Sequence, residues 1–202
     1  MRKVIKDDIN LQNLYLTALF DRRTLFDISD VEVIGNFICG GNDLTNLEGS
    51  PHTISKNFIC SDNNLTNLIG APHTVGGNFS CHSNHLTSLE GAPKTVGRDF
   101  ICCNNHLTSL KGASQTVVGD FDCSFNNLTN LIGSPHTVKG YFDCSNNRLL
   151  TSLKGIPKTI GGHFWISDGL REKFPEEHIR SLSNIKGRVL YEKLSQHFLQ
   201  YI

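Results

Sequence analysis

The chain has 202 residues, and its 19 Lys and Arg residues balance its 19 Asp and Glu residues, so its formal net charge is zero at pH 7. This balance argues against a basic nucleic-acid-binding domain and against a polybasic membrane patch. No apolar run approaches the roughly 20 residues of a membrane span, and charges occupy the amino terminus where a signal peptide is apolar. We therefore expect a cytoplasmic protein of one domain, with neither nucleic-acid nor membrane partners.

Residues 1–33 contain scattered apolar side chains but lack the sequence pattern that follows them. We expect them to form an N-terminal cap, because the end of a stack of β coils exposes unpaired strand groups that need cover. Val33 lies 21 residues before Ile54, which indicates a degenerate repeat at the end of this segment. The rest of the segment could form a helix that begins near Asp8.

From residue 34 to residue 167 the chain repeats the pattern F-x-C-x-x-N-x-L-T-x-L-x-G-x-P-x-T-V-G-G-N every 21 residues. A fixed period of this size predicts a solenoid. The phenylalanines are Phe37, Phe58, Phe79, Phe100, Phe121 and Phe142, followed by Phe164 after a step of 22 residues. The cysteines are Cys39, Cys60, Cys81, Cys102, Cys123 and Cys144. The asparagines are Asn42, Asn63, Asn84, Asn105, Asn126 and Asn147.

The repeat contains the residue types that a flat coil of chain needs. Phe and Cys two places apart point to the same side of an extended chain, so each F-x-C predicts a short strand with one buried face. Parallel stacking then brings identical residues about 4.8 Å apart, which turns each column into a ladder. A buried Asn has donors and acceptors for the turn that leaves the strand. Leu86 and Leu89 fill the far side of the coil, and Gly91 and Pro93 supply a turn.

The segment F-x-C-x-x-N-x-L resembles the L-x-L-x-x-N-x-L core of leucine-rich repeats, with Phe and Cys in two leucine positions. The short period and the L-T-x-L segment resemble the bacterial effector type, and L-T-S-L-x-G-A-P resembles repeats encoded by tailed bacteriophages. The resemblance implies a leucine-rich repeat solenoid, with a parallel β-sheet on the concave face and mostly extended chain and turns on the convex side. Its repeats would span residues 34–167, between an N-terminal cap and a C-terminal helical cap.

Two positions depart from the repeat. An extra residue lies near Leu149 and Leu150, where the spacing places Leu149 in the leucine column. Ser114 stands where the other repeats have proline.

The cysteines could suggest disulfides or a metal site, but six of the seven occupy one ladder position that faces the core. We expect them to be reduced and buried, where a free thiol acts as a small hydrophobic group. Cys103 follows Cys102 and should therefore point outward as a modifiable thiol. His82, Cys103 and His106 could converge, but a zinc site usually needs a fourth ligand. We expect no metal and no cofactor.

After Asp168 the pattern changes. Pro175, Glu176 and Glu177 predict the start of a helix. From residue 185 to residue 202 the spacing of Val189, Leu190, Leu194, Phe198 and Ile202 also predicts a helix. Residues 168–202 are therefore expected to form a C-terminal helical cap. The protein would be a monomer, or a homodimer through this helix.

The residues that alternate with Phe and Cys should form the outer face of the sheet. Its C-terminal half combines acidic and aromatic side chains, which suit a partner with a basic surface. The predicted protein-binding residues are Asp99, Asp120, Asp122, Phe125, Tyr141, Asp143, His163 and Trp165.

The chain contains no phosphate loop, zinc-protease motif or nucleophile elbow, so we expect a protein that is not an enzyme. A protein-binding scaffold is the favoured function, and the bacteriophage resemblance implies a stoichiometric inhibitor of a host defence protein in the host cytoplasm. A structural or assembly component of a virion is an alternative. The threonine column could instead form a flat ice- or glycan-binding surface; its members are Thr53, Thr74, Thr95, Thr116, Thr137 and Thr159.

Overall fold

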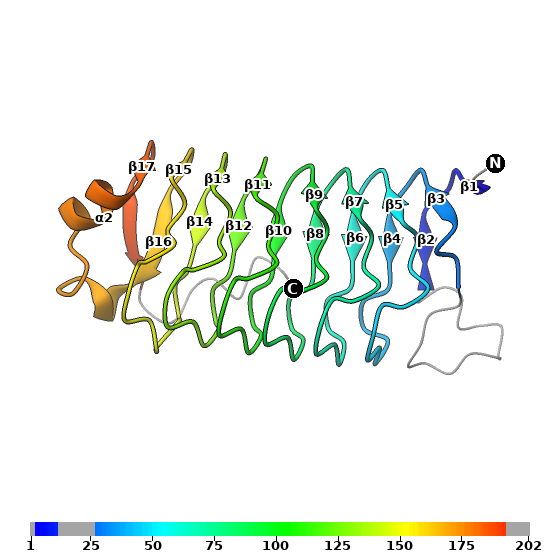
Figure 1. Ribbon diagram of the computed structural model, residues 1–202, viewed down its shortest axis with the longest axis horizontal. Helices are drawn as coiled ribbons and strands as arrows, with labels where there is room; N and C mark the ends of the chain where they lie inside the picture. The colour runs from blue at the N-terminus through cyan, green and yellow to red at the C-terminus, as the bar shows by residue number, and fades with distance from the viewer. Residues whose placement is uncertain (1–2, 12–26, 193–202) are drawn as a thin grey trace.

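The computed structural model describes residues 3–11 and 27–192, and these form an elongated stack of coils (Figure 1). Each coil contributes one short strand to each of two sheets, and the strands within each sheet are parallel. Each sheet has nine strands within the described residues. We call the sheet that contains the repeat phenylalanines the Phe sheet and the one that contains the T-V segments the Thr sheet. The predicted solenoid is confirmed.

The strands of the Phe sheet are β2 (Ile9–Asn10), β4 (Phe37–Ile38), β6 (Phe58–Ile59), β8 (Phe79–Ser80), β10 (Phe100–Ile101), β12 (Phe121–Asp122), β14 (Phe142–Asp143), β16 (Phe164–Ser167) and β18 (Val189–Glu192). Those of the Thr sheet are β1 (Lys3–Ile5), β3 (Val31–Val33), β5 (Thr53–Ile54), β7 (Thr74–Val75), β9 (Thr95–Val96), β11 (Thr116–Val117), β13 (Thr137–Val138), β15 (Thr159–Ile160) and β17 (Asn184–Ile185). Two short helices, η1 (Asp168–Leu170) and α2 (Glu176–Leu182), follow β16 at one end of the stack (Figure 1).

The strands pair with equivalent residues of neighbouring coils in register, as Phe121 does with Phe142. This register stacks the repeat phenylalanines into one column, in which adjacent ring centroids lie 5.1 to 5.9 Å apart. All seven rings are fully buried, and so are the six ladder cysteines, which carry no disulfide. Burial raises the pKa of the thiols, as at Cys81, and keeps them protonated. The predicted aromatic and thiol interior is confirmed.

The asparagine ladder joins successive coils. The Nδ2 group of Asn105 donates to the carbonyl oxygens of Cys102 and Cys103 in its own coil, at 3.3 and 3.2 Å, and to Cys81 in the coil before, at 3.0 Å. Its Oδ1 atom accepts the backbone N–H of Leu86 at 3.0 Å. A buried amide thus satisfies backbone groups of two coils at once, which explains why the repeat carries Asn here.

The glycine of the L-x-G turn is required for two reasons. Gly91 has a φ of 90°, in a region that L-residues other than glycine rarely adopt. A Cβ atom at Gly91 would also lie 2.5 Å from the carbonyl carbon of Leu68 in the preceding coil. Any side chain at this position would therefore force the two coils apart.

The first described residues already belong to the solenoid. Strand β1 pairs with β3, and Ile9 of β2 pairs with Phe37 of β4. The predicted degenerate repeat is confirmed, because Val33 pairs with Ile54. A helix beginning near Asp8 is wrong for residues 9–10, which are a strand, whereas Leu11 directly after them is helical. Residues 12–26 lie outside the described part of the chain.

The C-terminal segment differs from the expectation. Helix α2 begins at Glu176, directly after Pro175, as predicted. The helix expected from residue 185 onward is wrong as far as residue 192, because β17 and β18 form another coil there and Val189 pairs with Phe164. Leu194, Phe198 and Ile202 lie outside the described residues. Within 3–11 and 27–192, no helix combines the length and the apolar character that crossing a membrane requires.

The extra residue in the sixth repeat is accommodated on the outside. Leu150 is 1% exposed and fills the core, whereas Leu149 is 55% exposed. The assignment of Leu149 to the leucine column is therefore wrong, because the turn after Asn147 is one residue longer and shifts the inward position. Ser114 keeps the neighbouring turns connected, since its hydroxyl donates to the carbonyl of Pro93 at 2.6 Å.

Candidate binding face

The predicted binding residues lie along the outer face of the Phe sheet, in two columns and one adjoining turn. The first column precedes the phenylalanines and contains Asn36, Asn57, Asn78, Asp99, Asp120, Tyr141 and His163. The second column lies between Phe and Cys and contains Ile38, Ile59, Ser80, Ile101, Asp122, Asp143 and Trp165. Phe125 lies in the turn that follows β12.

The first column is a second hydrogen-bonded ladder. The side-chain Oδ1 atom of each Asn or Asp accepts the backbone N–H of the column residue one coil later. The donor and acceptor pairs are Asn36 to Asp8 at 2.8 Å, Asn57 to Asn36 at 3.1 Å, Asn78 to Asn57 at 2.8 Å, Asp99 to Asn78 at 3.3 Å, Asp120 to Asp99 at 2.9 Å and Tyr141 to Asp120 at 2.8 Å. Asp99 and Asp120 therefore supply with a carboxylate the accepting oxygen that Asn36, Asn57 and Asn78 supply with an amide.

The ladder resumes at the C-terminal end. The Nδ1 atom of His163 accepts the backbone N–H of Arg188 at 3.0 Å. A histidine nitrogen that accepts this bond must be unprotonated. Sequence reasoning treated His163 as a binding residue and missed this structural role.

The two column-one acids are half-buried. Burial raises the pKa of the Asp120 carboxyl above its usual value, and the neighbouring Asp99 and Asp122 act in the same direction. The N–H of Tyr141 opposes these effects because it stabilises the ionised form. Asp120 is thus held in place by a backbone bond in surroundings that disfavour its charge.

The two column-two acids are buried, contrary to the expectation that they face outward. Asp122 pairs in register with Asp143, and the two residues are 1% and 0% exposed. The Oδ1 atom of Asp122 accepts the N–H and the hydroxyl of Ser124 at 2.9 and 2.6 Å, and Oδ1 of Asp143 accepts the N–H of Ser145 at 2.8 Å. Each carboxylate folds back onto its own chain, which alternation alone does not predict.

Three aromatic residues of this face, Phe125, Tyr141 and Trp165, are half-buried. Phe125 has a φ of 52°, in the left-handed region. This conformation is a genuine outlier for a bulky residue. The equivalent residues of other coils are smaller or polar: Gly41, Asp62, Ser83, Asn104 and Asn146.

The expectation for Cys103 is wrong. Its side chain is 8% exposed, and burial followed by the charge of Asp122 raises the pKa of the thiol. The candidate zinc ligands do not assemble either: His106 stacks on His85 at 5.6 Å, and the described residues contain no group of three metal-ligating side chains. His82 instead lies 3.1 Å from the hydroxyl of Ser83.

The threonine column is in register on the Thr sheet, where Thr53 pairs with Thr74 and Thr137 with Thr159. Its side chains are exposed or half-buried. The residues that precede these threonines are large and exposed: His52, His73, Lys94, Gln115, His136 and Lys158. The threonine surface is therefore regular along the stack but flanked by a row of bulky polar side chains.

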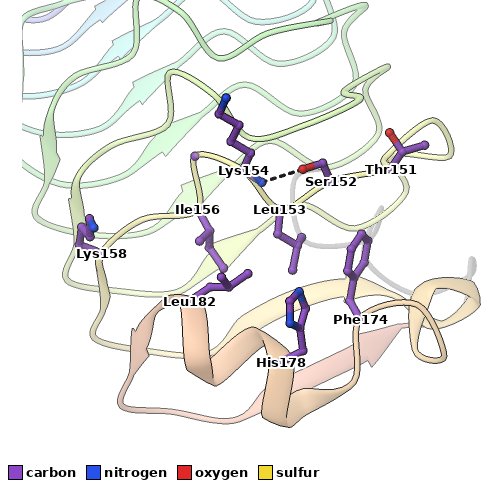
Figure 2. A pocket seen from close by; sticks show the side chains of 10 residues that line it. Thr151, Ser152, Leu153, Lys154, Ile156, Lys158, Phe174, His178 and Leu182 are labelled. Atoms are coloured by element: carbon purple, nitrogen blue, oxygen red, sulfur yellow. Dashed lines mark hydrogen bonds between the residues drawn. The ribbon is translucent and has the colours of Figure 1, made fainter.

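A pocket lies apart from the Phe-sheet face, between the turn at residues 151–158 and the segment that carries α2 (Figure 2). Its walls are mostly apolar. It is lined by Thr151, Ser152, Leu153, Lys154, Gly155, Ile156, Lys158, Phe174, His178 and Leu182.

Comparisons with protein-family models, with curated proteins and with solved structures found no match. The described residues form a parallel β-solenoid with a period of about 21 residues and continuous phenylalanine and threonine ladders.

Proposed function

We propose that this chain is a solenoid of the leucine-rich repeat type that acts as a non-enzymatic protein-binding scaffold. The observation that supports this function is the combination, on one end of the Phe-sheet face, of ladder-fixed carboxylates and half-buried aromatic rings. The contacting residues would be Asp99, Asp120, Phe125, Tyr141, His163 and Trp165. Asp122 and Asp143 are buried, so they would contribute to binding from beneath that surface and not by direct contact with the partner.

The physical argument rests on preorganisation. The Asp99 and Asp120 carboxylates each use Oδ1 in a bond to the next coil, which fixes their positions before any partner arrives. Groups that are already ordered lose little conformational entropy on binding. Half-buried Tyr and Trp side chains are the residue types that most often anchor protein interfaces. Fixed carboxylates beside them favour a partner with a basic surface.

The sequence resemblance to bacteriophage repeat proteins suggests which partner to test first. A host defence enzyme that acts on nucleic acid has a basic surface, and a scaffold with a fixed acidic face would block that surface by occupying it. Under this proposal the protein acts stoichiometrically in the host cytoplasm.

A capture experiment tests this function. Tagged protein is incubated with a lysate of the native host, and the retained proteins are identified by mass spectrometry. The Tyr141→Ser/Trp165→Ser variant should lose the partner while keeping its thermal unfolding curve. The matched control, Thr95→Ser/Thr116→Ser on the Thr sheet, should retain it. A partner retained equally by both variants would contradict the proposed face, and retention of virion proteins would favour an assembly role.

The threonine ladder supports a second candidate, a surface that binds ice or glycans. The favouring observation is the in-register pairing of Thr53, Thr74 and Thr95. The adjoining His52 and His73 rings stack at 5.3 Å and stand beside those hydroxyls, which breaks the flatness that a lattice would need. Ice binding is tested by measuring the thermal hysteresis of a concentrated solution of the protein. If no hysteresis is seen, ice binding is excluded as the function of this surface.

A further inference from the structure

The pocket at the C-terminal end of the stack has a volume of about 550 Å³. Sites for small molecules typically enclose 300–1,000 Å³ between mostly apolar walls with a few polar groups. One wall is the turn at residues 151–158, which belongs to the last full repeat. The other wall comes from Phe174 and helix α2, which were inserted between two coils of the solenoid. The site therefore arises where the repeat pattern is interrupted.

Apolar side chains from both sides line the base of the pocket. Leu153 and Ile156 approach from the repeat turn, and Phe174 and Leu182 approach from the opposite side (Figure 2). Leu153 and Phe174 are buried, whereas Leu182 is 42% exposed at the edge. Leu182 therefore adds exposed apolar surface at the rim of the pocket.

The polar groups of the pocket are basic. Lys154, Lys158 and His178 line it, and none of the lining residues within the described part of the chain is acidic. Both lysine side chains are exposed, and each carries its ammonium group on a flexible four-carbon stem. Figure 2 shows His178 pointing into the pocket from α2, whereas the Lys154 side chain on the opposite wall points away from the apolar lining residues.

This pair of lysines distinguishes the last full repeat from the others. The pairs at the positions of Lys154 and Lys158 in earlier repeats are Glu48 and His52, Ile69 and His73, Glu90 and Lys94, Lys111 and Gln115, and Ile132 and His136. Only the repeat that forms the pocket has lysine at both positions. The pair of lysines therefore occurs only in the repeat whose turn also lines the apolar part of the pocket.

We propose that this pocket binds a small amphipathic anion, a monocarboxylate with an apolar body. The apolar body lies on Leu153, Ile156 and Phe174, where its burial removes apolar surface from water. The carboxylate lies at the rim, where Lys154 and Lys158 supply charge-assisted hydrogen bonds. This site is separate from the Phe-sheet face, and neither depends on the other.

The test is a titration of the full-length protein with decanoate below its critical micelle concentration, followed by NMR of the backbone amides. We expect saturable shifts centred on residues 151–158 and 174–182. Decan-1-ol, which has the same apolar chain without the charge, should bind at least about tenfold more weakly. Equal affinity for the alcohol, or shifts centred elsewhere, would overturn the proposal.

Two variants test the two halves of the site. Lys154→Glu/Lys158→Glu should weaken decanoate binding by at least about tenfold, and Leu182→Ser should weaken decanoate and decanol alike. The altered side chains are exposed, so the fold should persist, which the NMR spectrum itself reports. The matched control is Lys94→Glu/Lys111→Glu, which reverses two exposed lysines outside the pocket. A control that loses as much affinity as the pocket variant would show that net charge, and not this pocket, attracts the anion.

Discussion

The Asp120 carboxylate accepts the backbone N–H of Tyr141 in the next coil at 2.8 Å. In earlier coils the amide oxygens of Asn57 and Asn78 accept the same bond, from the backbone N–H groups of Asn78 and Asp99. One column of side chains therefore joins coil to coil along the outer face of the Phe sheet, and at Asp120 the same residue also places a negative charge there. Asp120 therefore has a structural role in the ladder and, under the proposed function, a second role in binding the partner, and substitutions can separate the two.

Replacing Asp120 tests whether its oxygen or its charge matters to the fold. Asp120→Ala leaves the N–H of Tyr141 without its acceptor and should lower the free energy of unfolding by about 1 kcal/mol or more. Asp120→Asn keeps the acceptor and removes a like charge from beside Asp99, so it should be neutral or stabilising by up to about 1 kcal/mol. Urea denaturation measures both. Equal losses in the two variants would show that the ladder bond contributes little.

The benefit of Asp120→Asn should depend on pH. The folded pKa of Asp120 lies above its unfolded value of about 3.9, so the native state holds more protons than the unfolded state between these two values. Ionisation of Asp120 therefore lowers the stability of the wild type as the pH rises through that window. The variant should be relatively more stable at pH 7, and the difference should shrink below about pH 3.9. A difference that grows on acidification would contradict the direction of this pKa.

We expect the left-handed backbone conformation of Phe125 on the candidate binding face to lower the stability of the protein. Asn tolerates the left-handed region and already occupies the equivalent position at Asn104 and Asn146. Phe125→Asn should therefore raise the free energy of unfolding by about 1 kcal/mol. The same variant should capture the partner less well. A loss of stability would mean that contacts of the phenylalanine ring outweigh the backbone strain.

Leu149 and Leu150 provide a matched pair for the position of the core. Leu150→Ala should cost about 2–5 kcal/mol, because it removes a buried side chain and leaves a cavity. Leu149→Ala should change stability by no more than about 0.5 kcal/mol, since this side chain is mostly exposed. Thermal unfolding of the two variants under identical conditions makes the comparison. A larger loss at Leu149 would show that the sixth repeat packs in the register that the sequence alone predicts.

Much of the solenoid follows from the sequence because a constant period forces equivalent residues into register. Phe100 must stack on Phe121, and Asn105 must bond the coil before it, once every coil has the same length. The same reasoning fails where the length changes. The extra residue before Leu150 shifts the inward position, and the insertion that carries α2 hides the pairing of Val189 with Phe164.

The candidate face could be predicted only in part. Alternation places Asp120 and Asp122 on the face opposite the phenylalanines, but it carries no information on bonds within that face. Asp120 bonds along the stack to Tyr141, whereas Asp122 folds back onto Ser124 and is buried. Both outcomes depend on side-chain rotamers and on the spacing between coils, which a one-dimensional pattern does not contain. The pocket beside α2 was missed for a similar reason, because it is formed by an insertion outside the repeat.

The central claim, that ladder-fixed carboxylates and aromatic rings of the Phe sheet recruit a basic partner, is tested most directly by the affinity of a purified captured partner. Titration calorimetry compares the wild type, Tyr141→Ser/Trp165→Ser and Asp99→Asn/Asp120→Asn at low and high salt. We predict that the first variant abolishes binding, while the second stays at least as stable as the wild type, binds more weakly and shows a smaller salt dependence of binding. Unchanged affinity in both variants, with all three proteins folded, would contradict the claim.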